Sequence, residues 1–443
     1  MLGSVTANIA AMPSTIHPAV DIRAITRGRH HYFGYYDKSP WDPTGRYVLG
    51  MEAPFMDRPP RADDVAIVGM TDLQRGGEWI PLAETHAWNW QQGSMLQWLG
   101  QSSRVIFNDR HDGPAPRDSH LISRVLDVHS GETRTLDRPI YAVNRTGTAA
   151  VSLNFARLQH QRPGYGYPGV EDAWRTVLEP ADDGLYALDI ATGKSRLIMS
   201  TAEVAQHQRT PEFDGRLHRF NHVQFGADPQ RFAFLHRYKG LEERSSAVGQ
   251  TRLFTLNLDG TGLYCLSDCQ LVSHYDWRGG DAILAWARRH DQGDHYYLFT
   301  DRTPHVECIG REVLPCDGHC SFSPDLQWVL TDTYPDAEDF RTLILYHVAT
   351  GERIDIGRFH APPMEWQIRC DLHPRWNRDG TQICIDSLHE GVRQMYVLDV
   401  SAIIGAGEAA LTAGAANELE MAGATPNGAF HAATGRNVTL PAS

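Results

Sequence analysis

The sequence predicts an all-β protein, a seven-bladed β-propeller formed by a single domain, and three observations lead to it. Short apolar runs lie beside Gly, Asp or Asn turn residues along most of the chain. Stretches whose apolar residues recur with a helical period are scarce. A strand–turn–strand phrase recurs seven times, at intervals of roughly 45 to 55 residues, which suits the four-stranded blades of a propeller.

The blades can be followed in order along the chain. The seven phrases are SPWDPTGRYVLGME, MLQWLGQSSRVIFND, YAVNRTGTAAVSLNF, VQFGADPQRFAFLHR, YDWRGGDAILAWARR, SFSPDLQWVLTDTY and PRWNRDGTQICIDSL. Clear expected strands are Val65–Met70, Val105–Asn108, Leu185–Ile190, Leu253–Leu258, Leu343–Val348 and Met395–Val400. Turns between third and fourth strands are marked by Gly131, Gly193, Gly260 and Gly351.

The ends of the chain and one insertion complete this architecture. The last repeat has too few strands after Val400, so we expect the segment Val20–Thr26 to supply its fourth strand and close the ring. The propeller is expected over residues 20–401, and an Ala- and Gly-rich tail, residues 402–443, is expected to be peripheral. The insertion Gln159–Pro180 is expected to cover one face. A pair of β-sandwiches is the alternative, which the repeat count disfavours.

Composition and charge exclude several classes of protein. The 443 residues are 42% hydrophobic and 21% charged, which is typical of a globular protein rather than a disordered one. No apolar run reaches the roughly 18 residues of a membrane-spanning helix, so no membrane partner is expected. With 41 basic residues, 54 acidic ones and a net charge of −13, nucleic acid is a poor partner. An anionic substrate stays possible, because the local field of a cleft can oppose the net charge.

The cysteines and the N-terminus bear on the cellular compartment. Seven cysteines in a large chain indicate reduced thiols. The first 18 residues lack the charged start and long apolar run of a secretory signal. We therefore expect a cytoplasmic protein, or a periplasmic one if a signal has been removed. Cys265/Cys269 and Cys316/Cys320 lack a matched second pair, which favours core thiols over a zinc site.

Four histidines occupy equivalent positions in consecutive repeats. His222, His274, His319 and His373 are 52, 45 and 54 residues apart and lie where the chain enters the innermost strands. Those segments converge on one mouth of a propeller's central channel. A lone histidine is more often a surface or core residue, but four in phase with the blade period are expected to face one pocket.

Two kinds of chemistry suit such a pocket. Imidazoles together with a carboxylate such as Asp371 bind a divalent metal, with Mn²⁺ and Zn²⁺ as the main candidates. An imidazole outside the metal site can act as a general base near neutral pH. Arginines suit carboxylate recognition, or ordinary salt bridges, and the candidates are Arg110, Arg157, Arg237 and Arg369. The tryptophans of WNWQQG are compatible with sugar stacking and equally with a propeller core.

The C-terminal half, about residues 216–400, resembles the oligogalacturonate lyases, which are seven-bladed propeller polysaccharide lyases. RFNHVQF is similar to the family segment that carries the proposed catalytic histidine, and this matches His222. SHYDW is similar to THEFW, whose histidine binds manganese, and this matches His274. GHCSFSPDLQWVLTD resembles the following blade and places His319. DLHPRW resembles HPHPSF, in which His373 matches a metal-binding histidine.

The chain departs from the family pattern at two positions. Asp371 stands where the family has a second histidine, and Ile368 stands at about the place of a glutamine ligand. The resemblance therefore implies an altered metal site of His274, Asp371 and His373, joined by His319, or no metal. The N-terminal half does not resemble the family closely, and ulvan lyases share the architecture. We therefore expect a sister family that acts on a uronate glycan other than pectin.

The mechanism that the resemblance implies is β-elimination on a uronate-containing oligosaccharide. His222 is the expected base for the C5 proton, and a metal or an arginine neutralises the carboxylate. Arg237 is assigned to that carboxylate and Tyr275 to catalysis, with Tyr35 and Tyr36 as other candidates to protonate the leaving oxygen. The residues expected to bind the oligosaccharide are His31, Tyr35, Tyr36, Trp90, Gln91, Arg157 and Arg369.

Two other functions stay open at this point, and so does the oligomeric state. A glycoside hydrolase on the same scaffold would use paired carboxylates. Its candidate acids are Asp37, Asp276, Asp332 and Asp371. A non-catalytic propeller that binds other proteins would need no ring of histidines. The ultraviolet absorbance of an unsaturated uronate distinguishes a lyase from a hydrolase.

Overall fold

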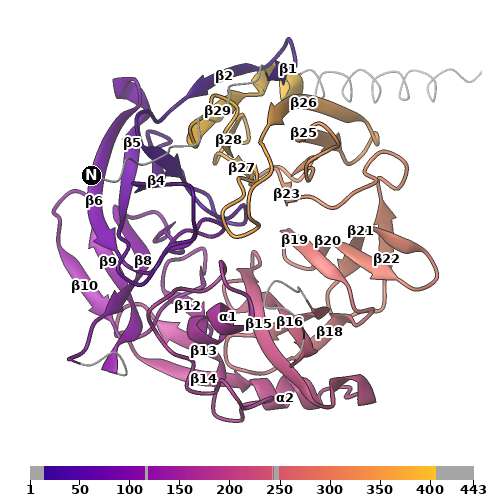
Figure 1. Ribbon diagram of the computed structural model, residues 1–443. Helices are drawn as coiled ribbons and strands as arrows, with labels where there is room; N and C mark the ends of the chain where they lie inside the picture. Colours follow the sequence, from indigo (N-terminus) through magenta and orange to yellow (C-terminus); the bar gives the residue numbers. More distant parts are fainter. Residues whose placement is uncertain (1–13, 115–117, 242, 244–248, 406–443) are drawn as a thin grey trace, which may run out of the picture. The chain divides into compact units, whose positions relative to one another are not determined.

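The computed structural model describes residues 14–114, 118–241, 243 and 249–405. In the first compact unit, Met1–Ser401, seven sheets surround a common axis (Figure 1). The predicted all-β, seven-bladed propeller is thereby confirmed. The first strand of each blade lies nearest the axis and the fourth lies at the rim. The tail residues 406–443 lie outside the described residues.

Blades one to three take up the N-terminal half. Blade one consists of β3 (His30–Tyr32), β4 (Tyr47–Ala53), β5 (Ala66–Asp72) and β6 (Glu78–Thr85), with a short 3-10 helix, η1 (Leu73–Arg75). Blade two consists of β7 (Gln97–Trp98), β8 (Arg104–His111), β9 (His120–Asp127) and β10 (Thr133–Leu136). Blade three consists of β11 (Ala142–Val143), β12 (Ala149–Ser152), β13 (Gly184–Asp189) and β14 (Ser195–Ser200).

Blades four to seven take up the remainder. Blade four consists of β15 (Arg216–Phe225), β16 (Arg231–Gly240), β17 (Gln250–Asn257) and β18 (Tyr264–Ser267). Blade five consists of β19 (Val272–Arg278), β20 (Ala282–Arg289), β21 (Gly293–Thr300) and β22 (Val306–Ile309). Blade six consists of β23 (Ser321–Phe322), β24 (Trp328–Asp332), β25 (Phe340–His347) and β26 (Arg353–His360). Blade seven contains β27 (Arg375–Trp376), β28 (Gln382–Ser387) and β29 (Gln394–Asp399).

The ring is closed by the N-terminal segment, as predicted. Strand β2 (Asp21–Ala24) pairs antiparallel with β29, with Asp21 opposite Asp399, and becomes the fourth strand of blade seven. A second strand, β1 (Thr15–Ile16), was not predicted because two residues carry no alternating pattern. It pairs with β26 and gives blade six a fifth strand. The N-terminal segment therefore joins two adjacent blades.

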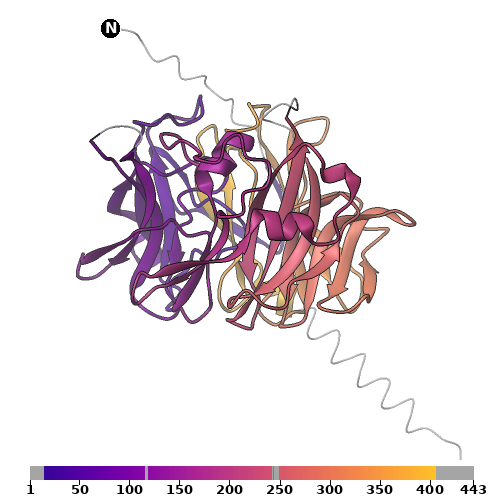
Figure 2. The same ribbon diagram turned by 90° about the horizontal axis from the view of Figure 1, so that it is seen from below.

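Three short helices lie in or directly after the blade that carries the insertion, blade three. Helix α1 (Phe155–Gln161) begins at Asn154, whose side chain accepts from the backbone N–H of Arg157. A long loop follows and returns to β13. Helix α2 (Thr201–Gln206) follows blade three, and the 3-10 helix η3 (Pro211–Phe213) precedes β15. Viewed from the side, the α1 insertion lies at one end of the strands (Figure 2).

The faces of neighbouring blades pack against each other through large apolar side chains. Phe220, Phe232, Phe234 and Phe254 of blade four belong to one buried cluster with side chains of blade three. Such burial is the main source of stability in this fold, since each blade has little core of its own. All seven cysteines are unpaired. None of the helices within the described ranges is long and apolar enough to traverse a lipid bilayer.

Candidate active site

Four imidazoles from four consecutive blades meet at one mouth of the channel. His222 lies on β15, His274 lies on β19, and His319 and His373 lie two residues before the starts of β23 and β27. The ring centroids are 6.1 Å apart for His222 and His274, 4.2 Å for His274 and His319, and 4.4 Å for His319 and His373. All four side chains are buried. The four histidines that share the blade period therefore lie together, as expected from the sequence.

Irregular backbone aims these side chains into the mouth. The pairing of β15 with β16 slips between Asn221 and Gln224, and that of β19 with β20 slips between Val272 and Tyr275. Each slip is a β-bulge, and each bulge contains one of the histidines. His222 and His373 also have positive φ angles of 51° and 42°. Such left-handed backbone in residues other than glycine is concentrated at functional sites, where the surrounding structure imposes it.

Two carboxylates fix the orientation of two of the rings. Nδ1 of His274 lies 2.9 Å from Asp317, and Nδ1 of His319 lies 2.9 and 3.0 Å from the two oxygens of Asp332. A carboxylate on Nδ1 leaves Nε2 with its lone pair, which is the arrangement that holds metal-binding histidines in proteins. Burial lowers the pKa of His274 even though Asp317 opposes this effect. The ring is therefore neutral and available as a ligand.

One set of side chains fits a divalent metal. Ligand atoms of His319, Asp371 and His373 all lie within 4.8 Å of one another. Nε2 of His373 is buried and has no hydrogen-bond partner within the described chain, which is costly unless something binds there. Two imidazoles and a carboxylate suit Mn²⁺ or Zn²⁺. His274 adjoins His319 but is not within this set.

The carboxylate of this set is held by two arginines. Asp371 accepts from Arg341 at 3.2 Å and from Arg369 at 2.5 Å. Burial alone would raise the pKa of Asp371, but the two guanidinium groups lower it well below its usual value. A carboxylate has about four acceptor positions, so an ion and two arginines can share it. Asp371 is therefore charged, and Arg369 is largely committed to it.

His222 faces a tyrosine hydroxyl. The Tyr35 hydroxyl lies 3.2 Å from Nε2 of His222, and the two rings stack at 4.8 Å. Burial lowers the pKa of His222 well below its usual value, and the positive charge of Arg237 lowers it further. Burial raises the pKa of Tyr35 well above its usual value. A neutral imidazole beside a protonated phenol is thus the resting state of this pair.

Arg237 is a buried cation whose hydrogen-bond partners are all neutral. It donates to the side chains of Asn221 at 3.0 Å and Thr251 at 2.8 Å, and to the carbonyl of Val272 at 3.5 Å. Burial lowers its pKa to about 10, which still leaves it charged at neutral pH. No carboxylate of the described chain forms an ion pair with it. Arg237 therefore has no counter-charge among the described residues in direct contact with it.

The insertion Gln159–Pro180 forms part of the edge of the channel mouth. The Arg162 guanidinium lies 4.0 Å from the Trp366 ring and 5.5 Å from the Tyr165 ring. Those two rings are nearly parallel, with centroids 6.4 Å apart, and the cation contacts both. Tyr165 also lies 6.1 Å from His222. The insertion of blade three thus reaches the segment that leads into blade seven.

Tyr275 and Tyr36 lie at the mouth, but their hydroxyls are committed to the backbone. The Tyr275 hydroxyl donates to the carbonyl of His222. The Tyr36 hydroxyl donates to the carbonyl of Tyr275 at 2.9 Å. Tyr275 therefore supports the β15 bulge that contains His222, and Tyr36 supports the β19 bulge that contains His274. The hydroxyl of Tyr275, which was assigned to catalysis, thus already donates to a carbonyl group, and its catalytic role stays a prediction.

Four residues expected to bind substrate have other partners in the structure. Arg157 donates to the carbonyls of His218, Trp174, Val177 and Leu178 and so anchors the insertion. Trp90 packs against Trp88 and Arg393 in the core. His31 lies between Arg29, Glu52 and Trp79, outside the cluster. Gln91 donates to the carbonyls of Gln367 and Arg369. All four side chains are therefore engaged in contacts within the protein.

Sequence reasoning missed three residues of the site. Asp317 lies two residues before His319, and this short spacing could have indicated it. Arg341 lies on β25 of blade six and forms an ion pair with Asp371, which lies just before blade seven. Only the packing of these two blades shows this ion pair. Tyr165 comes from an insertion that has no counterpart in the other repeats. None of the three carries a local sequence signal as strong as the histidine period.

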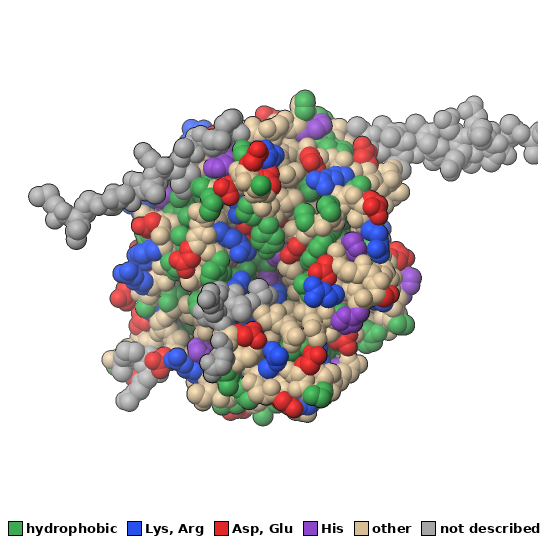
Figure 3. Space-filling model, turned by 45° about the vertical axis from the view of Figure 1, so that its right-hand side comes forward, with side chains coloured by type: hydrophobic (Ala, Val, Ile, Leu, Met, Phe, Trp, Pro, Cys, Tyr) green, Lys and Arg blue, Asp and Glu red, His purple; other side chains and the backbone are tan. Residues whose placement is uncertain are grey.

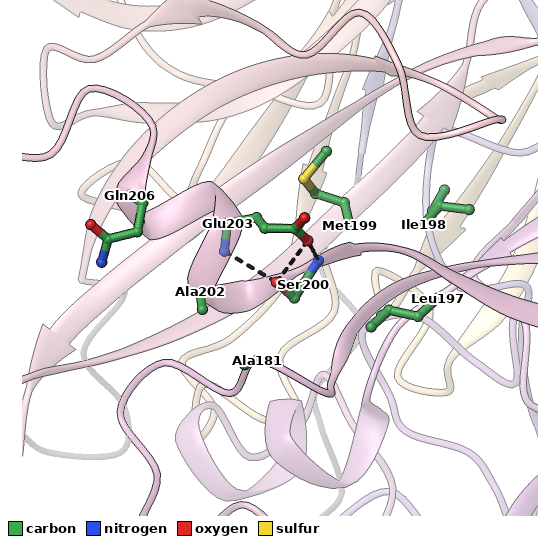
Figure 4. Close-up of a pocket in the computed structure, with 8 residues that line it drawn as sticks. All are labelled: Ala181, Leu197, Ile198, Met199, Ser200, Ala202, Glu203 and Gln206. Carbon is green, nitrogen blue, oxygen red and sulfur yellow. Dashed lines mark hydrogen bonds between the residues drawn. The ribbon is translucent and has the colours of Figure 1, made fainter.

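A second pocket lies elsewhere on the propeller, and no histidine lines it. It is lined by Ala181, Leu197, Ile198, Met199, Ser200, Ala202, Glu203 and Gln206 (Figure 4). Its polar side chains Ser200 and Glu203 cap helix α2 by bonding each other's backbone N–H groups. On the surface in Figure 3, acidic and basic side chains are interspersed around a central hollow. The histidine cluster is the better candidate for chemistry.

We expect Gly318→Ala to displace His319. A Cβ atom at residue 318 would lie 1.8 Å from the carbonyl oxygen of Asp332, so the backbone next to His319 would have to move. We expect the free energy of unfolding to fall by about 1–3 kcal/mol, as for other overpacked sites. Any affinity of this site for a divalent metal ion should fall as well.

Denaturant unfolding and metal titration would measure both effects. Gly280→Ala is the matched control, because a Cβ there meets no atom within 4 Å. Wild-type stability and affinity in Gly318→Ala would contradict the tight approach of residue 318 to Asp332.

The fold and this site define the class of the protein as a seven-bladed propeller with a histidine-lined mouth. Two solved structures share its fold, oligogalacturonate lyase from Vibrio parahaemolyticus and an oligogalacturonate lyase in complex with manganese. Each has a TM-score of 0.58 at 14% sequence identity, over 88% of this chain and 97% of the other. The expected structural resemblance is thus confirmed at the level of the fold. No protein-family model matches the chain, and no curated protein matches it.

Proposed function

We propose that the protein is a lyase that cleaves a uronate-containing oligosaccharide by β-elimination. The observation that carries the proposal is the pairing of a buried neutral base, His222, with a buried cation, Arg237, whose partners are all neutral. A substrate carboxylate supplies the missing counter-charge of Arg237. The charge of Arg237 acts on His222, so the base and the bound carboxylate would share one site. The shared fold with oligogalacturonate lyases supports the same chemistry.

The reaction needs an acidified C–H bond and a base without a proton. The carboxylate on Arg237 is neutralised, which stabilises the negative charge that develops when the C5 proton leaves. His222 accepts that proton on its imidazole. The C4–O4 bond breaks, its electron pair leaves with the oxygen, and a C4–C5 double bond forms. The burial that keeps His222 neutral also strengthens each electrostatic contact in the site.

A divalent ion fits the neighbouring set of side chains. His319, Asp371 and His373 would hold it, with His274 beside them, and the manganese complex of a structural neighbour supports this assignment. When bound, the ion supplies a second positive charge to the substrate carboxylate. Asp332 and Asp317 fix the rings of His319 and His274, and Arg341 fixes Asp371.

A glycoside hydrolase is less consistent with this site. Asp37 binds Lys38, Asp332 binds His319, and Asp371 binds two arginines. Asp276 accepts from Gln224 and from the backbone of Phe322. Each of the four candidate acids is thus committed to a partner in the protein. A pair of free carboxylates flanking a glycosidic bond is not among the described residues at this mouth.

A panel of uronate-bearing oligosaccharides tests the proposal. We expect an increase in ultraviolet absorbance from the unsaturated uronate, with one new reducing end per double bond. Reducing ends without this absorbance would indicate hydrolysis and would overturn the proposal. A complete absence of turnover, with capture of a protein partner at the same mouth, would favour a binding scaffold.

Removing the metal should abolish this activity. We expect protein dialysed against a chelator to lose turnover and to regain it when Mn²⁺ is added at one ion per chain. The reason is that the ion neutralises the carboxylate of the substrate. His373→Ala should bind Mn²⁺ at least tenfold more weakly by equilibrium dialysis. His305→Ala, which changes an exposed histidine paired with Glu307, is the control. Full activity in verified metal-free protein would contradict the ligand assignment.

A further inference from the structure

The hydroxyls around His222 differ in what they can do. Those of Tyr275 and Tyr36 donate to the backbone carbonyls of His222 and Tyr275, so their protons are already engaged. The Tyr35 hydroxyl is directed at Nε2 of His222, 3.2 Å away. In the tautomer that carries its proton on Nδ1, His222 accepts a hydrogen bond from Tyr35 through the Nε2 lone pair. Base and nearest acid are therefore in direct contact.

The distance between the two groups restricts the geometry of elimination. An acid or base acts on an atom within about 3 Å of it. Groups that serve C5 and O4 from opposite faces of a sugar ring must therefore be roughly 6 Å or more apart. The 3.2 Å separation of Tyr35 and His222 leaves no room for a ring between them. The spacing of catalytic groups predicts stereochemistry in glycosidases by the same reasoning.

We propose that Tyr35 is the general acid and that the enzyme eliminates across a single face of the uronate, which selects sugars whose C5 hydrogen and O4 lie on the same face. This inference rests on the proposed lyase function. D-Glucuronate and D-mannuronate have that configuration. In D-galacturonate, the C4 epimer, and in L-guluronate, the C5 epimer of mannuronate, the two groups lie on opposite faces.

The protons balance within the pair. The Nε2 atom of His222 takes the C5 proton while the C4–O4 bond breaks and the C4–C5 double bond forms. The Tyr35 hydroxyl gives its proton to O4, so the leaving sugar departs as an alcohol. The tyrosinate then recovers a proton from Nε2 of His222 across the same 3.2 Å contact. The pair returns to its resting state without a proton from solvent.

Two matched pairs of substrates test the stereochemistry. Oligoglucuronates are compared with oligogalacturonates, and oligomannuronates with oligoguluronates, by ultraviolet absorbance of the unsaturated product. In whichever pair is cleaved, we expect kcat/KM to be at least tenfold higher for the oligoglucuronate than for the oligogalacturonate, or for the oligomannuronate than for the oligoguluronate. A smaller or reversed ratio overturns the single-face assignment and leaves the lyase function intact. No unsaturated product from any of the four overturns the lyase function as well.

A variant of Tyr35 tests its role as the acid. Tyr35→Phe keeps the ring that stacks on His222 but removes the proton, so kcat should fall roughly 100-fold or more with little change in KM. A substrate with an activated aryl leaving group at O4 should recover most of this loss, because that oxygen needs no proton. An equal loss on both substrates would show a merely structural role and overturn the assignment. Tyr297→Phe, whose hydroxyl donates to the Gly293 carbonyl in blade five, is the matched control.

Discussion

His222→Asn is expected to reduce kcat by roughly 100- to 10,000-fold, the usual contribution of a general base. Asparagine has no basic nitrogen, so the C5 proton would have no acceptor. It is a better choice than alanine because residue 222 has a φ of 51°, and asparagine adopts this left-handed backbone readily. The backbone contacts of the bulge with Tyr141 and Tyr275 should therefore survive. Initial rates by ultraviolet absorbance would measure the effect.

The folded state of this variant has to be verified separately. Its thermal midpoint and its Mn²⁺ affinity should match those of the wild type, because residue 222 is outside the set of His319, Asp371 and His373. His305→Ala again controls for the loss of an imidazole on the surface. Turnover within a few-fold of the wild type would remove His222 from the role of base.

Asp371→Asn is expected to be the most destabilising change at the site. Asp371 forms ion pairs with Arg341 and Arg369, and the side chains of Asp371 and Arg341 are 1% and 3% exposed. Removing one member of a buried ion pair leaves the other charge uncompensated and costs about 3–5 kcal/mol. Loss of a metal ligand should abolish Mn²⁺ binding at the same time. Denaturant unfolding and equilibrium dialysis would measure the two effects.

The pH dependence of this loss follows from the low pKa of Asp371. A carboxyl whose pKa is lower in the folded protein contributes its stability above the unfolded pKa, about 4 for aspartate. That contribution is lost as the pH falls through the folded value. The stability gap between Asp371→Asn and the wild type should thus be complete at pH 7 and narrow only below about pH 4. A gap that widened on acidification would contradict the charged state of Asp371.

A surface ion pair provides the matched control. Asp336 and Arg358 lie 2.6 Å apart with side chains 40% and 36% exposed. Because exposed pairs contribute little, Asp336→Asn should change stability by less than about 1 kcal/mol and leave activity unaltered. Equal losses in Asp336→Asn and Asp371→Asn would show that burial of the Asp371 pair is not the source of its effect.

The sequence was most informative where a signal repeats. Strand, turn and strand recur at a fixed interval, so seven blades and the ring-closing strand near Val20–Thr26 could be predicted. The same interval brought out His222, His274, His319 and His373, because equivalent points on neighbouring blades are neighbours in space. Strand β1 escaped prediction since its two residues show no alternation.

Side-chain direction was much harder to predict. Tyr35, Tyr36 and Tyr275 were all expected at the mouth, yet only Tyr35 presents its hydroxyl to the imidazole of His222. Arg157 and Arg237 were treated as equivalent carboxylate ligands, whereas Arg157 binds four backbone carbonyls and Arg237 has only neutral partners. Torsion angles and two bulges decide these differences, and neither is encoded in the residue type.

The sequence by itself determined the propeller, its closure and the set of histidines that share a mouth, because period and strand pattern are local properties that add up around a ring. Only the tertiary structure decided which atoms face each other there. The contacts of Asp317, Asp332 and Arg341 with the cluster, and the 3.2 Å contact of Tyr35 with His222, join residues from different strands or different blades. Such contacts depend on packing angles and backbone bulges that exist only once the blades are assembled.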